Sequence, residues 1–257
     1  MGSVFMCGIV PQLVAPSIFP DAPAAYTLIA KYTESQTIVA PEDGYYQLEI
    51  HGQSGSGGTA LARGDSMTED GNTYSYKSCT AGGGGGGSGA YVLSNLIKLN
   101  KGDTINISYD ASGNISVEIN SSTGEVYDTM KATSATNGGN ARITDYGDED
   151  DETFDTAYAG TAGKGGQAEG GNVTNIDGND GKAGSAINEK ISSKEPGKRF
   201  PVSGGAGGAA VAEGGNAGGS GGSVVNYDGG LSAPGPVKSG FVNFYRGNTN
   251  VVAQEGA

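Results

Sequence analysis

Six consecutive glycines at positions 82–87 limit most strongly what this chain can fold into. Glycine loses more conformational entropy on folding than any other residue, so an ordered glycine tract needs a compensating interaction. Residues 160–171 and 204–222 are also rich in glycine. Tracts of this kind are either flexible linkers or packed elements in which there is no room for a Cβ atom.

Between the glycine tracts, apolar and polar residues alternate in short runs that are typical of half-buried β-strands. No segment has a helical period, so we expect an all-β protein. Residues 59–78 are polar and are expected to form a loop before the glycines. The predicted strands lie at residues 26–33, 37–40, 45–51, 91–99, 104–109, 115–119 and 241–246.

The last predicted strand favours packed glycine over a linker. A single strand cannot be stable alone, so residues 241–246 must pair with the earlier strands and the chain between must leave and return. Within that chain, glycines recur at every third position, as at Gly215, Gly218 and Gly221. Polyproline-II geometry has three residues per turn and no internal hydrogen bonds. Packed side by side, such helices could satisfy each other's amides and carbonyls; a disordered linker stays the alternative.

We therefore predict a β-sandwich or jelly-roll-like body with packed polyglycine-II-type helices inserted between its strands. Residues 1–24 contain four prolines and are expected to form an extended arm. Residues 25–156 would be the β body with the first glycine clusters. Residues 157–240 would be the glycine-rich region with surface excursions, and residues 241–257 the closing strand and tail.

The charge of the chain excludes several classes of partner. A net charge of −13 would repel nucleic acids and anionic membranes, and the densest basic run, residues 194–199, is interrupted by Glu195 and Pro196. No apolar run is long enough for a membrane helix. No secretory signal is evident, so we expect synthesis in a cytoplasm. Cys7 and Cys79 are expected to be thiols, since a single pair does not make a disulfide framework.

The residues give little support to catalysis, and we expect no enzyme. His51 is the only histidine and is expected on a strand surface, without a nucleophile–base arrangement. The acidic residues 145–155 offer oxygen ligands for Ca²⁺ but lack the EF-hand spacing. We expect a solvated loop and no cofactor, with Asp148, Asp150 and Asp151 as weak calcium candidates. The glycine clusters lack the Gly-Lys-Ser/Thr of a phosphate loop.

Three motifs together resemble the glycine-rich tail proteins of bacteriophages and phage-tail-like bacteriocins. PEDGYYQLEIHGQSGSGG is similar to their opening strand, turn and glycine cluster. GGGGGGSGAYV followed by LNKGDTINISYDASG is similar to their second cluster and hairpin, and GPVKSGFVNFYRG to their terminal strand. The resemblance covers residues 26–247 and rests on composition. The chain departs from long adhesin tips in having a substantial β body and only two late tracts.

The resemblance implies a virion protein of the tail, with a receptor-binding or fibre-tip role on the bacterial surface. It implies binding to a surface polymer or protein receptor through the excursions at residues 172–180, 187–202 and 224–231. We expect a homotrimer whose N-terminal arm contacts other tail or baseplate proteins. The alternatives are a purely structural tail, baseplate or head-decoration protein, a secreted bacterial adhesin, and a carbohydrate-degrading tail enzyme. The candidate receptor-binding residues are Asn175, Asp177, Tyr227 and Asp228.

Overall fold

A computed structural model describes residues 22–69, 72–144, 156–190, 206–207, 209–210, 212, 214–224 and 231–248 of the chain. All regular elements in this part are β-strands, as predicted, and no helix occurs among these residues. The strands are β1 (Tyr26–Tyr32), β2 (Gln36–Val39), β3 (Gly44–His51), β4 (Leu61–Glu69), β5 (Asn72–Ala81), β6 (Tyr91–Leu99), β7 (Thr104–Tyr109), β8 (Ile115–Asn120), β9 (Val126–Ala132), β10 (Arg142–Thr144), β11 (Thr156–Tyr158), β12 (Ala168–Glu169), β13 (Thr174–Ile176), β14 (Ala186–Lys190) and β15 (Phe241–Gly247).

The body consists of two five-stranded antiparallel sheets that share one apolar core. Sheet A has the order β1-β15-β3-β6-β13, and sheet B has the order β12-β9-β8-β7-β2. The closing strand β15 lies between β1 and β3, which confirms that it pairs with the first part of the chain. The core includes Tyr46, whose ring stacks on Phe244 at 5.2 Å between centroids.

Strict alternation explains why the core lies between these sheets. In β8, Ile115, Val117 and Ile119 are buried while Ser116 and Glu118 are exposed. β3 has the same period, with Leu48 and Ile50 fully buried. Because successive side chains of a strand point to opposite faces, each sheet presents one apolar face to the other and its second face outward.

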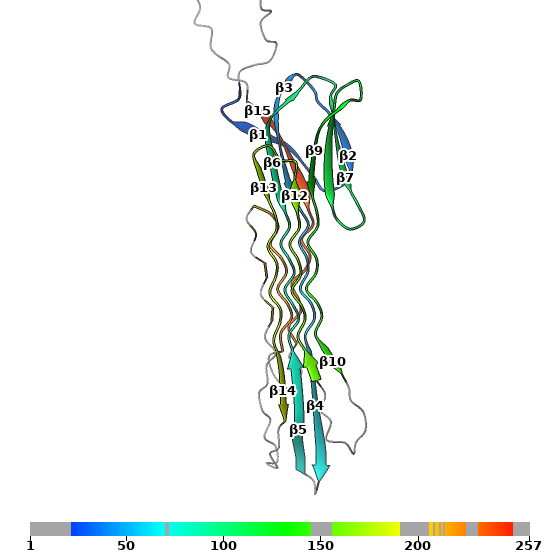
Figure 1. Cartoon of the computed structure of the whole chain (residues 1–257), viewed down its shortest axis with the longest axis vertical. Coiled ribbons are helices and arrows are strands. Elements are labelled where there is room, and N and C mark those ends of the chain that lie inside the picture. Colours follow the sequence, from blue (N-terminus) through cyan, green and yellow to red (C-terminus); the bar gives the residue numbers. More distant parts are fainter. Residues whose placement is uncertain are drawn as a thin grey trace, which may run out of the picture.

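Glycine-rich segments extend from one end of the body and run side by side (Figure 1). The tract at residues 82–89 lies among six of them. Its N–H groups donate to carbonyls of three neighbouring segments, and its carbonyls accept from N–H groups of three others. Acceptors for Gly84 and Gly87 are Gly139 and Thr136, three residues apart. The other acceptors lie in residues 179–185 and 216–222, and residues 52–58, 160–166 and 207–210 donate to the carbonyls of the tract.

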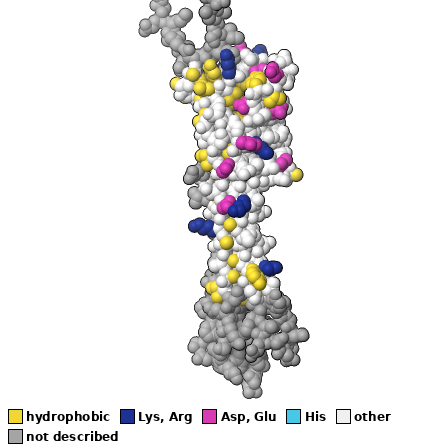
Figure 2. All heavy atoms as spheres, in the orientation of Figure 1, with side chains coloured by type: hydrophobic (Ala, Val, Ile, Leu, Met, Phe, Trp, Pro, Cys, Tyr) yellow, Lys and Arg dark blue, Asp and Glu magenta, His cyan; other side chains and the backbone are white. Residues whose placement is uncertain are grey.

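Close packing explains why glycine occupies these positions. A Cβ atom added to Gly84 would lie 1.7 Å from the carbonyl oxygen of Thr161, and one added to Gly87 would lie 2.0 Å from that of Lys164. Figure 2 shows that the face seen there carries few coloured side chains over this stretch. The bundle is therefore held together mainly by backbone groups.

The pairing of the strands continues through the bundle without a change of register. In the body Ile50 pairs with Val92, in the bundle Gly55 donates to Gly87, and beyond it Ala62 pairs with Thr80. The pairing of β12 with β9 similarly continues through the Gly139–Thr161 hydrogen bond to β10 and β11. Body, bundle and far end are thus one continuous set of chain pairs.

The expected loop at residues 59–78 was wrong. Most of that segment forms the antiparallel hairpin of β4 and β5, which β14 joins to make a three-stranded sheet. These strands were not predicted because their sequence is polar. In the structure, the register of the bundle segments at 52–60 and 82–90 continues into them. The short strands β9 to β14 were also not predicted, and β13 from the glycine-rich region pairs with β6 of the body. The N-terminal arm at 1–24 lies almost entirely outside the described residues.

Candidate functional site

The end of the bundle far from the body is the candidate functional site, and we call it the distal end. The β4–β5 hairpin, the β10–β11 pair and β14 all extend from it (Figure 1). The isolated bridge between Val224 and Leu231 also follows a bundle segment there, since Gly222 is hydrogen-bonded to Gly58 and Gly83. Several strands that are distant in sequence therefore lie together at this end of the bundle.

A small apolar cluster lies where these strands meet the bundle. Cys79, Ala81, Ala141 and Ala157 are buried, and Ile143 and Ala186 pack against them. The cluster joins residues of β5, β10, β11 and β14.

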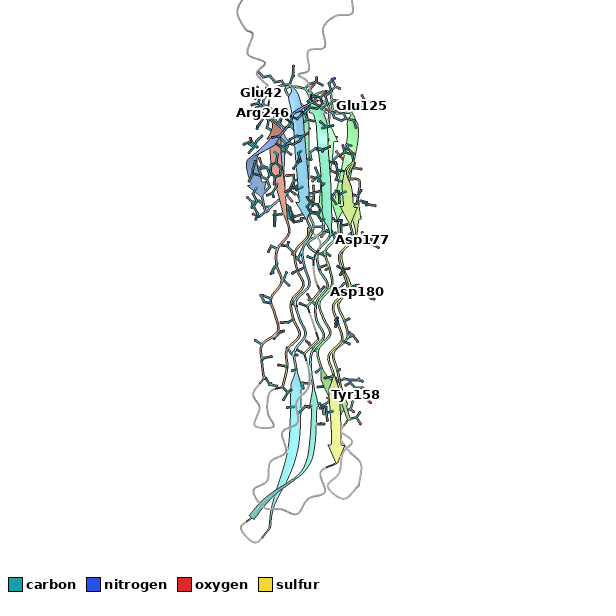
Figure 3. All side chains as sticks on the ribbon, turned by 90° about the vertical axis from the view of Figure 1, so that its left-hand side faces the viewer. Glu42, Glu125, Tyr158, Asp177, Asp180 and Arg246 are labelled. Carbon is teal, nitrogen blue, oxygen red and sulfur yellow. The ribbon has the colours of Figure 1, made fainter. Side chains whose placement is uncertain are left out.

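Arg142 and Tyr158 form an exposed contact at the distal end that sequence reasoning missed. The guanidinium carbon of Arg142 lies 4.7 Å from the centre of the Tyr158 ring, in a cation–π arrangement. Tyr158 is 43% exposed, and Figure 3 shows it at the opposite end of the bundle from Glu42 and Arg246. The only signal in the sequence is an aromatic residue three positions after the acidic run, which is too common to be selected. Tyrosine provides contact area at a low cost in side-chain entropy.

Asn175 and Asp177, two of the predicted receptor-binding residues, lie at the body end of the bundle. Asn175 belongs to β13, and its side chain accepts from the Gly171 amide at 2.8 Å and donates to the Gly171 carbonyl at 2.7 Å. The Asp177 carboxylate accepts from the Ala168 amide at 2.8 Å. Figure 3 shows Asp177 at the junction of body and bundle. Both side chains thus stabilise the turn that connects β12 to β13.

The other candidates, Tyr227, Asp228, Asp148, Asp150 and Asp151, lie outside the described residues. Tyr227 and Asp228 fall between the bridged residues Val224 and Leu231, and the three aspartates fall between β10 and β11. Each group is therefore bounded by chain that the structure places at the distal end. Among the described residues, no group of three or more His, Cys, Asp or Glu side chains could hold a metal ion.

His51 is half-buried rather than at the surface as expected. Its ring stacks on Phe241 at 4.2 Å and meets Tyr91 edge-on at 5.0 Å, and its side chain is 17% exposed. Burial lowers the pKa of His51, an effect that the nearby Glu49 carboxylate opposes. His51 is therefore a packing residue on the outer face of sheet A.

Glu49 is the acceptor at the centre of that outer-face cluster. It accepts from the Tyr245 hydroxyl at 2.6 Å and from the Asn243 amide at 3.0 Å. Burial alone would raise the pKa of Glu49, but these hydrogen bonds outweigh it and lower the pKa. The hydrogen bonds from Tyr245 and Asn243 favour the ionised form of the Glu49 carboxylate. This arrangement suits a structural role.

Comparisons of the chain with models of protein families, with curated proteins and with solved structures found no match. The described part of the chain contains no helix that is long and apolar enough to cross a membrane.

Proposed function

We propose that the glycine-rich segments are polyglycine-II-type helices packed around the tract at residues 82–89. Three observations support this interpretation. Contacts to each neighbouring segment recur at every third residue, as expected for three residues per turn. The hydrogen bonds of the tract run between segments. Cβ atoms at Gly84 and Gly87 would meet neighbouring backbones.

We further propose that the protein is a structural and interaction component of a phage or phage-tail-like bacteriocin tail, at the fibre tip, and contacts the bacterial surface through its distal end. The observation that carries this proposal is the gathering of β4, β5, β10, β11 and β14 at the distal end, opposite the end of the body where Ala25 and Asn248 lie. There the backbone N–H of Asn248 donates to the Ala25 carbonyl at 2.9 Å, so these two residues lie side by side in the body. Attachment at the body end would leave the distal end free to reach a receptor.

The bundle suits the role of a stiff spacer in this proposal. Within the described residues, its hydrogen bonds join eight chain segments in both parallel and antiparallel directions, so bending would stretch many of them at once. The six segments around residues 82–89 all come from one chain, so the centre of the bundle is complete without a second copy. The homotrimer and the contact of the N-terminal arm with other tail proteins stay predictions, and light scattering of the purified protein would test the first.

Shortening the distal hairpin tests the receptor-binding role. Replacing residues 65–77 by Asn-Gly retains the pairing of Gly64 with Ser78 and supplies a two-residue turn. The full chain should bind bacterial cells and block adsorption of the phage that carries it, whereas the shortened chain should fail at unchanged melting temperature. Glu125→Ala, an exposed change at the body end, is the control and should bind like the full chain (Figure 3).

A full chain that binds no cells of a strain the phage infects would refute the receptor-binding role and favour the purely structural alternative. Release of reducing sugars from the host polysaccharide would instead favour the tail enzyme. The position of the gene gives an independent test, because neighbouring genes for tail-fibre or baseplate proteins are expected.

A further inference from the structure

The outer face of sheet B contains a hollow of about 660 Å³ in the body, far from the distal end. The hollow lies over β7, β8, β9 and β12, and we call it the sheet B groove. Its volume is within the range of pockets that hold small ligands. The residues that line it are Asn106, Ser108, Ser116, Val117, Glu118, Thr129, Met130, Lys131, Glu169 and Gly170.

Strand register explains why the face is hollow there. Ser108 pairs with Ser116 directly across β7 and β8, so two of the smallest side chains stand opposite each other. In the next outward-facing row Asn106 pairs with Glu118, and Ser116 pairs with Lys131 on its other side. Longer side chains therefore surround the serines. The four strands span about 14 Å at the usual strand separation, which gives the groove length as well as depth.

Three hydroxyl groups of the groove are available to a ligand, whereas the side-chain oxygen of Asn106 accepts from the Thr37 hydroxyl at 2.8 Å. The hydroxyls of Ser108, Ser116 and Thr129 make no hydrogen bond to other protein groups within the part of the chain that the structure describes. One oxygen of Glu118 accepts from the Asn120 amide at 2.9 Å, which orients the carboxylate. Val117 and Met130 are at most 1% exposed, so they add almost no apolar surface.

Charge and polarity select the class of occupant. Lys131 lies 3.9 Å from Glu169, which balances its charge, and Glu118 leaves the groove with a net negative charge. An anionic polymer would be repelled, and a protein partner would lack the aromatic and apolar anchors on which interfaces depend. A neutral saccharide supplies many hydroxyls that donate to carboxylates and exchange hydrogen bonds with serine and threonine. We propose that the sheet B groove binds a neutral oligosaccharide, at a site separate from the distal end.

Binding of defined sugars to the full chain tests this proposal. The probes are neutral hexasaccharides of glucose, galactose, mannose and N-acetylglucosamine, with a sulfated heparin hexasaccharide for comparison, measured by saturation-transfer NMR and calorimetry. At least one neutral probe should bind, and the sulfated probe should not. Ser116→Tyr should abolish binding by filling the groove. Glu118→Gln should weaken it about tenfold, which corresponds to about 1.4 kcal/mol.

Two matched variants separate the groove from general effects. Ser112→Tyr places the same ring on an exposed turn outside the groove, and Glu125→Gln removes the same charge elsewhere; both should bind like the unaltered chain. The proposal is overturned if no neutral probe binds, if Ser116→Tyr binds as well as Ser112→Tyr, or if the sulfated probe binds best. The shortened distal hairpin should still bind the sugar, so this site and the proposed receptor contact can fail independently.

Discussion

Replacing Gly84 by alanine should destabilise the whole protein, because this residue lies where the bundle has least space. The added Cβ would lie 1.7 Å from the Thr161 carbonyl oxygen and 2.5 Å from its carbon, whereas real Cβ contacts are essentially never shorter than 3.0 Å. The neighbouring segment would have to move by about 1.3 Å. That movement acts on backbone atoms, which cannot rotate away like a side chain.

The cost has two parts. Overpacking of a tight interior costs about 1–3 kcal/mol. Gly84 also donates to Gly139 at 2.9 Å and accepts from Gly58 at 2.8 Å, and weakening both hydrogen bonds adds about 1 kcal/mol each. A total of about 3–5 kcal/mol is a large part of the stability of an ordinary domain. At about 2–4 °C per kcal/mol, the melting temperature should fall by at least about 6 °C.

Gly44→Ala is the matched control for this experiment. Its added Cβ would meet only the Tyr46 ring, at an ordinary contact distance of 3.8 Å. This variant should be neutral or slightly more stable, because alanine restricts the unfolded chain. Calorimetry and urea unfolding of both variants give the comparison. If Gly84→Ala melts at the same temperature as Gly44→Ala, the glycine tract is not packed and the reasoning about the bundle is refuted.

Three further predictions concern the body and the whole chain. The heat-capacity change of unfolding should lie below about 12–15 cal/mol/K per residue, because a bundle of backbone amides exposes little apolar surface; a calorimetric value within that range would contradict a backbone core. Because burial lowers the pKa of His51, the unfolded state binds the proton more readily, and the unfolding free energy should fall as pH drops from about 7 to 5. Melting curves of His51→Gln should lack this part of the pH dependence, and an unchanged slope would exclude His51 as its source. Tyr127→Phe should lower the unfolding free energy by about 1.5 kcal/mol in urea titrations, because the Tyr127 hydroxyl donates to the buried Asp103 carboxylate; a loss near zero would mean that water replaces the hydroxyl.

The body strands were predictable because their signal is local. Alternation in β3, β7, β8 and β15 needs only the neighbouring residues, and the structure places these strands as expected. The distal hairpin of β4 and β5 was not predictable in this way. Its strands carry a polar sequence, and their pairing follows from segments 52–60 and 82–90, whose own partners lie far apart in the chain.

The candidate site shows the same limit. Asn175 and Asp177 were chosen as polar residues in an excursion from the glycine tract, but their side chains bond to the turn between β12 and β13. The sequence does not indicate at which end of the bundle an excursion lies, because successive segments alternate in direction. The sheet B groove also needs β9 and β12 beside the β7–β8 hairpin, and the pairing of β12 with β9 joins residues that are far apart in the sequence.

The continuous register has a consequence for how the distal end could change. Pairing of β3 with β6 passes through the bundle into β4 and β5, and pairing of β9 with β12 passes into β10 and β11. A residue inserted within the bundle would therefore put the strands of one end out of register with those of the other, because every backbone contact beyond it would shift. A residue inserted between Glu69 and Asn72, the last described pair of β4 and β5, would shift none of the described pairs of these strands. The register thus tolerates a change of length between β4 and β5 but not within the bundle, where each backbone contact depends on the one before it.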